Sequence, residues 1–267
     1  MGGDFCIMDI TRRDIIAIFE RTLLPDERVQ AFWLEGADAQ GTVDDYSDLD
    51  LWLDVIDGYE EAVLAEIRDI LLALSPLDFY HERHHPHPQL RQAFIHLSGT
   101  SPFLVIDLCI QSHSRQIAFT RQHVDEVVQV IFDKSDVIRW RDVDEKLYQS
   151  DLRARVRDLL VTFPFFLIWV TKGIRRDNYL EALSYYQNLV LKPLVELCRI
   201  CYCPTKKDFY LKHIQRDLPN DLVRTLTDLH RVTTLADIQD KTVIAEKLFW
   251  EIAEEVSQNP QMEGVDC

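Results

Sequence analysis

The chain has 267 residues, 47% of them hydrophobic, and its 45 acidic and 29 basic residues give a net charge of -16. This length allows one large or two ordinary domains with proper cores. The acidic balance argues against nucleic-acid binding, which relies on Lys and Arg to neutralise phosphates, and favours a cationic partner.

The first half of the chain alternates helical and extended patterns. Thr11, with Asp14 three residues later, predicts a capping box at the start of a helix over 12–24. Apolar residues at helical spacing predict a second helix over 60–75. Apolar or alternating runs predict the strands 29–34, 49–55, 78–82, 92–97, 103–111 and 127–132. We therefore expect an α/β domain with a mixed sheet over residues 1–140.

The second half is helical in pattern, with a single glycine between residue 141 and residue 257. Helices are predicted over 143–172, 179–201, 221–229 and 237–257, with a kink or interruption at Pro164 and a kink at Pro193. An all-α helical bundle is expected over 141–267, which makes the fold class α+β. Four basic residues near its middle are interpreted as a solvated surface: Lys206, Lys207, Lys212 and Arg216.

Two aspartates open the second predicted strand, just after a glycine turn. Gly36 and Gly41 follow the first predicted strand, and Asp48 and Asp50 stand two residues apart. Side chains alternate along a strand, so both carboxylates project to one face. Paired carboxylates suit Mg²⁺, and a glycine turn lets backbone N–H groups approach a phosphate. The alternative is a solvated turn ahead of a strand.

Asp107 interrupts an apolar run that predicts a central strand covered on both faces. A lone charge there is costly unless it is paired or bound to a metal. Asp107 is therefore the candidate third carboxylate, the alternative being a salt-bridged core aspartate or an early strand end.

The spacing of the glycine turn and the Asp-x-Asp pair resembles the nucleotidyltransferase superfamily of the polymerase beta type. The Gly-x-x-Ala-x-Gly and Tyr-Ser-Asp-x-Asp pieces, within residues 34–55, are similar to antibiotic nucleotidyltransferases that act on aminoglycosides and lincosamides. The resemblance implies a catalytic α/β domain, a helical bundle, and an acceptor bound in the cleft between them. It also implies transfer of a nucleoside monophosphate, taken as AMP from ATP, to a hydroxyl of a small aminoglycoside-like molecule, with release of pyrophosphate.

The resemblance assigns roles to residues of the first half, whereas no sharp motif assigns a residue of the bundle. There Lys172, Glu181 and Tyr185 are the candidates, with a solvated helix-end cation as the alternative for Lys172. The catalytic and metal-binding set, with Mg²⁺ as cofactor, is Asp48, Asp50 and Asp107. Contacts to ATP are expected from Gly36, Ala37, Gly41, Ser47 and Lys172. The cationic acceptor is expected at Glu181 and Tyr185, one helical turn apart.

This chain departs from the motif at two positions. Ala37 stands where Ser is usual, and Gln40 where Arg is frequent. A lost hydrogen bond to a charged group is worth about 1.5–3 kcal/mol, although backbone donors can compensate. A regulatory module that binds nucleotide with a weakened site therefore stays open. A protein-directed nucleotidyltransferase of the antitoxin kind is a further alternative, although the long bundle argues against it.

The remaining features are interpreted as ordinary. The six cysteines lack the paired spacing of a zinc site and are expected to be free thiols. No secretion signal is recognised, and the longest apolar run, 159–170, is too short to cross a bilayer. We therefore expect a cytoplasmic monomer or homodimer without membrane contact.

Overall fold

The computed structural model describes residues 10–121 and 126–259. The chain divides into two compact units, Met1–Val143 and Asp144–Cys267, and each unit is described by itself. Among the described residues, no helix is long and apolar enough to cross a membrane.

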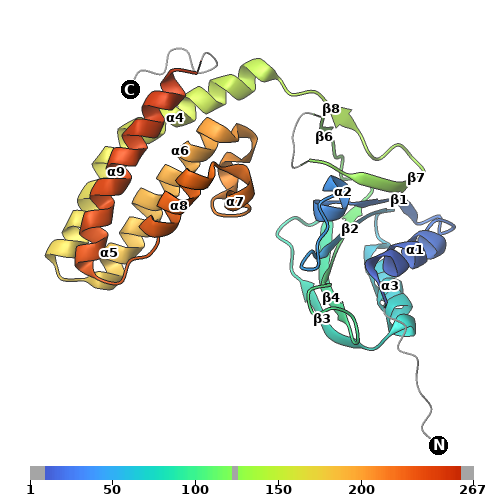
Figure 1. Cartoon of the computed structure of the whole chain (residues 1–267). Coiled ribbons are helices and arrows are strands. Elements are labelled where there is room, and N and C mark those ends of the chain that lie inside the picture. Colours follow the sequence, from blue (N-terminus) through green and yellow to red (C-terminus); the bar gives the residue numbers. More distant parts are fainter. Residues whose placement is uncertain (1–9, 122–125, 260–267) are drawn as a thin grey trace, which may run out of the picture. The chain divides into compact units, whose positions relative to one another are not determined.

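Unit 1 combines three helices with eight strands in its described residues (Figure 1). The helices are α1 (Arg12–Leu23), α2 (Gly36–Gln40) and α3 (Glu60–Leu74). The strands are β1 (Val29–Leu34), β2 (Leu49–Val55), β3 (Leu77–Arg83), β4 (Leu90–Leu97), β5 (Ile106–Ser112), β6 (Phe119–Thr120), β7 (Gln129–Asp133) and β8 (Trp140–Arg141).

Six strands form one mixed sheet in the order β3-β4-β5-β2-β1-β7. Only β2 and β5 pair in parallel in this sheet, as far as the chain is described, and their other neighbours are antiparallel. α1 and α3 lie together on one side of the sheet (Figure 1). Their apolar faces close the core of unit 1 against one face of β1, β2, β4 and β5. The mixed sheet predicted from the sequence is therefore confirmed.

Most predicted elements of unit 1 occur within two residues of their expected bounds. Thr11 and Asp14 form the expected capping box on α1. The exception is β5, which begins at Ile106 because a turn at 102–103 precedes it. Both faces of β5 are covered, as predicted: Leu108 and Ile110 pack under the helices, and Cys109 and Gln111 are buried on the other face.

A small second layer lies on the other face of the sheet. β6 and β8 pair in parallel as a two-stranded sheet. Ala31, Trp33 and Ile138 form a separate buried cluster, with Trp52 and Phe119 packed against it. Residues 113–121 and 126–141 thus partly cover the face opposite the helices.

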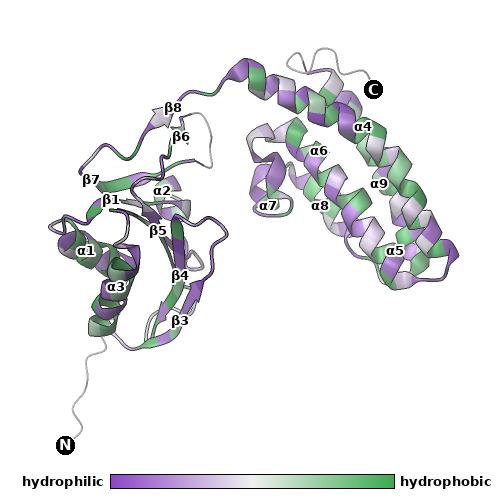
Figure 2. Ribbon diagram, turned by 180° about the vertical axis from the view of Figure 1, so that it is seen from behind, coloured by the Kyte–Doolittle hydropathy of each residue, from purple (hydrophilic) through white to green (hydrophobic). Residues whose placement is uncertain are grey.

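Unit 2 consists of helices in its described residues. They are α4 (Glu145–Arg175), α5 (Tyr179–Tyr185), the π-helix η1 (Tyr186–Leu191), α6 (Lys192–Tyr202), the 3₁₀ helix η2 (Pro204–Phe209), α7 (Ile214–Asp217), α8 (Asn220–Leu229) and α9 (Leu235–Ser257). Along α4 and α9, hydrophobic and hydrophilic residues alternate (Figure 2), as expected for helices with one buried face. The helical C-terminal part predicted from the sequence is confirmed.

Pro164 and Pro193 affect their helices differently. α4 runs through Pro164 as one α-helix, so the helix is not interrupted there. Before Pro193 the chain instead forms η1, in which the Lys192 N–H bonds the Gln187 carbonyl five residues back. Pro193 has no N–H to donate to the Leu189 carbonyl. The α-helical hydrogen-bond pattern is therefore broken at this point, where the chain forms the π-helix.

A buried arginine anchors the segment that follows α6. Arg199 is fully buried and pairs with Asp217 at 3.1 Å. Its guanidinium also donates to the carbonyls of Tyr210 at 2.7 Å and Lys212 at 2.5 Å. Lys206 binds the same Asp217 carboxylate at 2.8 Å, so it belongs to this network rather than to a solvated basic surface.

We expect Arg199→Met to lower the free energy of unfolding by about 3–5 kcal/mol, because it leaves Asp217 and two carbonyls without their buried partner. Urea unfolding followed by circular dichroism measures the change. Arg224→Met, at a well-exposed side chain of α8, is the control and should change stability by less than about 1 kcal/mol. Equal effects of the two substitutions would contradict the anchoring role.

Candidate active site

The parallel pairing of β2 with β5 brings two carboxylates together. In this register Asp50 lies directly opposite Asp107. Leu51 and Leu108, the next pair, belong to the core under the helices. Because side chains alternate along strands, Asp50 and Asp107 project to the face opposite the helices. Both are half-buried.

The third predicted carboxylate, Asp48, lies just before β2 and is exposed. Burial raises the pKa of Asp107, and the nearby charge of Asp48 raises it further. Gln92 on β4 opposes this shift, since its Nε2 donates to both Asp107 oxygens, at 2.8 and 3.1 Å. Asp48 and Asp107 therefore interact electrostatically at the start of β2 and β5.

Gly36 packs directly against Asp50. Its φ is +58°, and a Cβ built on it would lie 1.9 Å from Asp50 Oδ2. The backbone N–H of Glu35 also donates to the Asp50 carbonyl at 3.2 Å. Because Gly36 has no side chain, the Asp50 carboxylate can occupy this space.

The rest of the glycine turn forms the short helix α2. Gly41 ends it with φ at +67°, and the Thr42 N–H bonds the Ala37 carbonyl at 3.0 Å. The Ser47 hydroxyl donates to Asp44 Oδ1 at 2.8 Å and so stabilises the loop before β2. Ala37 and Ser47 are both half-buried.

Arg12, which the sequence analysis missed, links these pieces. Its guanidinium donates to the carbonyls of Ser47 at 2.5 Å and Asp48 at 3.1 Å, and it pairs with Asp38 on α2. One side chain from α1 therefore holds α2 and the residues at the start of β2. Nothing in its local sequence indicates this role, because its partners lie at least 26 positions away.

The donor chemistry of this cluster fits a hard divalent cation. Mg²⁺ commonly takes one or two protein carboxylates and completes its shell with water and substrate phosphates. Asp50 and Asp107 offer such carboxylates, and Gly36 leaves the room in which Asp50 sits. In the part of the chain that the structure describes, no three His, Cys, Asp or Glu side chains form a metal-binding group by themselves.

The predicted residues of unit 2 contact one another through Trp169. Lys172 Nζ lies 4.3 Å from the centre of the Trp169 ring, and Tyr185 lies beside the same ring at 5.9 Å. The Tyr185 hydroxyl donates to Glu181 at 3.0 Å. Arg176 approaches Glu181 at 3.7 Å. Glu181 and Tyr185, which stand one helical turn apart, thus contact each other.

The four cysteines that lie within the described residues are free, as predicted. Burial raises the pKa of Cys109, so its thiol is protonated beside Asp107. Cys6 and Cys267 lie outside the described residues.

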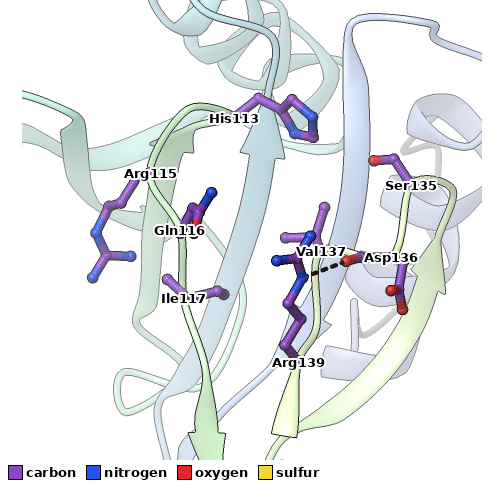
Figure 3. Close-up of a pocket in the computed structure, with 8 residues that line it drawn as sticks. All are labelled: His113, Arg115, Gln116, Ile117, Ser135, Asp136, Val137 and Arg139. Atoms are coloured by element: carbon purple, nitrogen blue, oxygen red, sulfur yellow. Dashed lines mark hydrogen bonds between the residues drawn. The ribbon is translucent and has the colours of Figure 1, made fainter.

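A small cavity of about 140 Å³ lies elsewhere in unit 1, where the loop after β5 approaches the loop after β7 (Figure 3). His113 borders it, and His113 Nδ1 is 2.6 Å from the fully buried Asp54. Figure 3 shows that the Arg115 guanidinium points away from Ser135 and Arg139. This side chain also lines a second, larger cavity.

The strand–glycine turn–strand unit with aligned aspartates is the arrangement that the resemblance to nucleotidyltransferases predicts, and a family comparison assigns the chain to this class. Residues 11–264 match the model of the streptomycin adenylyltransferase family. The chain therefore belongs to this family of enzymes.

Solved structures give weaker similarity. An aminoglycoside 6-adenyltransferase from Bacillus subtilis is 16% identical, with 96% of each chain covered and a TM-score of 0.40. A nucleotidyltransferase-like protein from Exiguobacterium sibiricum is 11% identical, with 94% of this chain and 85% of that chain covered and a TM-score of 0.34. A comparison with curated proteins gives no match.

We expect Gly36→Ala to reduce nucleotidyl transfer at least a hundredfold, because its Cβ would displace the Asp50 carboxylate. Gly99→Ala is the matched control: Gly99 has φ at +82° but nothing within 4 Å of an added Cβ. Both variants should lose about 1–2 kcal/mol of stability from the positive φ, and only Gly36→Ala should lose activity. Steady-state kinetics and urea unfolding measure the two effects. Equal activity in both variants would contradict the packing argument.

We expect Arg12→Met to lower kcat about tenfold or more, because α2 and the start of β2 lose a shared charged donor worth about 1.5–3 kcal/mol. Steady-state kinetics at saturating substrates give kcat. Arg13→Met, at the exposed neighbouring position, controls for the loss of one charge on α1. An Arg12→Met enzyme with the kcat of the control would exclude a positioning role for Arg12.

Proposed function

We propose that this enzyme transfers AMP from Mg²⁺-ATP to a hydroxyl of streptomycin or a related aminoglycoside and releases pyrophosphate. The observation that carries the proposal is the alignment of Asp50 with Asp107 on parallel strands, beside Asp48 and the glycine turn. The family match supports the chemistry and the class of acceptor. Unit 1 is the proposed catalytic domain and unit 2 the helical bundle domain.

Asp48, Asp50 and Asp107 are the residues that would hold Mg²⁺. When bound, the ion neutralises phosphate charge and stabilises the oxygens that attack and leave. Burial raises the pKa of Asp107 and the charge of Asp48 raises it further, so a bound cation would favour the ionised form of this carboxyl group.

The glycine turn is the proposed phosphate site. Gly36 and Gly41 keep the backbone of α2 free of side chains at both of its ends. Ala37 provides no hydroxyl, so its backbone N–H is the proposed donor, and Ser47 shapes the neighbouring loop. Lys172 is proposed to bind the triphosphate. In the structure its ammonium group lies over the ring of Trp169.

The reaction is an in-line displacement at the α-phosphorus. The acceptor hydroxyl oxygen forms the new bond to phosphorus while the bond to the β-phosphate oxygen breaks, and pyrophosphate leaves with those electrons. Asp107 accepts the hydroxyl proton, and Gln92 holds its carboxylate in place. Positioning and charge neutralisation supply most of the acceleration.

The acceptor is proposed to be cationic, because the chain carries a net charge of -16. Glu181 would bind an ammonium or guanidinium group of the aminoglycoside, and Tyr185 would orient Glu181 through its hydroxyl. Arg176 lies at the same carboxylate and would exchange with the ligand cation.

We expect Asp50→Asn to lower transfer by about a thousandfold, because it removes one charge of the aligned pair Asp50 and Asp107. Formation of adenylylated streptomycin from labelled ATP and Mg²⁺ is followed by mass spectrometry and pyrophosphate release. Asp45→Asn, in the exposed loop before β2, is the matched control. An Asp50→Asn enzyme that stays active, or a wild type that modifies no aminoglycoside, would overturn the proposed function.

A further inference from the structure

His96 on β4 meets a hydrogen-bond acceptor at each of its two ring nitrogens. Nδ1 lies 2.6 Å from Oδ1 of Asp78, and Nε2 lies 2.9 Å from the carbonyl oxygen of Ser101. Nε2 also lies 3.4 Å from Oγ1 of Thr100, whose hydroxyl donates its hydrogen to the Leu97 carbonyl. In these contacts both ring nitrogens therefore face acceptors.

This arrangement requires the charged form of the imidazole. A neutral imidazole has one N–H donor and one bare nitrogen, which here would direct its lone pair at a carboxylate or a carbonyl. The imidazolium has two N–H groups and satisfies both acceptors. The side chain of His96 is only 15% exposed, so an unsatisfied contact at this place is costly.

The pairing of β3 with β4 brings Asp78 to this position. Leu77 lies opposite Leu97 and Phe79 lies opposite His96, so the register shifts at Asp78, the extra residue between the two pairs. Such a β-bulge redirects a side chain that would otherwise point to the other face of the sheet. The irregularity in the edge strand and the ion pair with His96 thus occur at the same place.

Ser101, the second partner of His96, begins the segment that leads into β5. Its carbonyl also accepts the Leu104 N–H at 2.9 Å. At the end of the segment, the Val105 carbonyl accepts the N–H of Leu49 at 2.8 Å. Leu49 is the residue between the two aspartates that open β2. The segment 101–105 is therefore bonded directly to the start of β2.

The same segment also contacts the loop before β2. The rings of Phe103 and Tyr46 meet edge-on with their centres 4.9 Å apart, and Tyr46 stands two residues before Asp48. Arg12 holds this loop from α1 through the Ser47 carbonyl. The segment 101–105 is thus a second restraint on the start of β2, on the side of β5.

Asp78 is the charged partner of His96 among the described residues. The other titratable residues on the same face of β3 and β5 lie opposite Phe94 or Gln92 rather than opposite His96: His81, Arg83, Asp107 and Cys109. From the segment after β4, Thr100 and Ser101 contribute uncharged acceptors only.

The protonation of His96 is linked to pH with a definite sign. Burial disfavours its charge, but the hydrogen bonds to Ser101 and Asp78 and the charge of Asp78 together raise its pKa above the ordinary value of 6.5. The stabilisation by the imidazolium is therefore fully present below about pH 6.5, and it is lost as the pH rises through the raised pKa.

We propose that His96, as an imidazolium, is a positioning residue of the candidate active site: it fixes the segment 101–105 to β3 and so holds the start of β2. When the imidazolium loses a proton to solvent, one of its two hydrogen bonds is lost. Bonds to a charged acceptor are the stronger ones, so the bond to the Ser101 carbonyl opens and the segment is released. Only the kinetic consequence of this inference rests on the proposed function.

NMR spectroscopy of the ring nitrogens tests the charged state directly, with the His96 signals identified by their loss in His96→Gln. We expect both nitrogens to be protonated at about pH 7, with a titration midpoint above the ordinary value. Asp78→Asn should lower this midpoint by about one unit or more. Asp69→Asn, at an exposed carboxylate of α3, is the matched control and should leave it unchanged. A midpoint at or below the ordinary value in wild type would overturn the proposal.

Hydrogen exchange of the Leu49 N–H tests the restraint on β2 without any substrate. After correction for intrinsic exchange rates, its protection should fall about fivefold between about pH 6 and about pH 8.5. In His96→Gln it should be low at both pH values. The N–H of Leu53, further along β2, is the internal control and should not respond. Equal protection of Leu49 in wild type and His96→Gln would contradict the restraint.

The pH profile of kcat for transfer to streptomycin tests the effect on catalysis. We expect kcat of wild type to fall about fivefold between about pH 6.5 and about pH 8.5. In His96→Gln kcat should already be low and this alkaline decline should be absent, and in Asp78→Asn the decline should move to lower pH. Protonation of Asp107 acts on the acid side of the profile and is thereby distinguished. The same alkaline decline in wild type and a folded His96→Gln enzyme would exclude the positioning role.

These measurements separate the two proposals. If wild type adenylylates streptomycin but the titration midpoint of His96 is ordinary, only the role of His96 is wrong. If the midpoint and the protection of Leu49 behave as expected but no aminoglycoside is modified, the restraint by His96 stands and the proposed function is wrong.

Discussion

The parallel register between β2 and β5 is the constraint on which the candidate site depends. It sets Asp50 opposite Asp107 and, in the same step, directs Leu51 and Leu108 into the core under α1 and α3. A slip of one residue would turn a carboxylate toward the helices and a leucine toward solvent. The burial that stabilises the sheet therefore also fixes the two acidic side chains, so fold and site are specified by one pairing.

Gathering acidic groups on one face has an electrostatic cost, and neighbouring residues offset it in distinct ways. Gln92 donates to both Asp107 oxygens, and Arg12 binds the backbone carbonyl of Asp48. The contribution of Gly36 is steric: it has no side chain, and any side chain there would occupy the position of the Asp50 carboxylate. Because these contacts come from β4, α1 and α2, the cluster is held in place by three elements besides the strands that carry it.

Local patterns in the sequence predicted the local features of the structure. The capping box at Thr11 and the alternation over residues 49–55 are short-range signals, and both elements formed as expected. Arg12 and Arg199 could not be found in this way, because each acts through partners that are distant in sequence. Lys206 was misread for the same reason: its sequence neighbours are polar, whereas its actual partner is Asp217, eleven positions later.

The two faces of the sheet explain why the fold accommodates a polar site at its centre. The helix side of β1 and β2 is almost entirely aliphatic and aromatic, so its burial supplies stability without polar groups. The opposite side carries Trp52 between Asp50 and Asp54 along a single strand, with each side chain in a different environment. Asp54 is fully buried and bonded to Gln111, whereas Asp50 is only half-buried beside Gly36. One strand thus places a structural carboxylate under the covering layer and a candidate catalytic carboxylate at its open end, and the difference between them arises from what covers each position rather than from residue type.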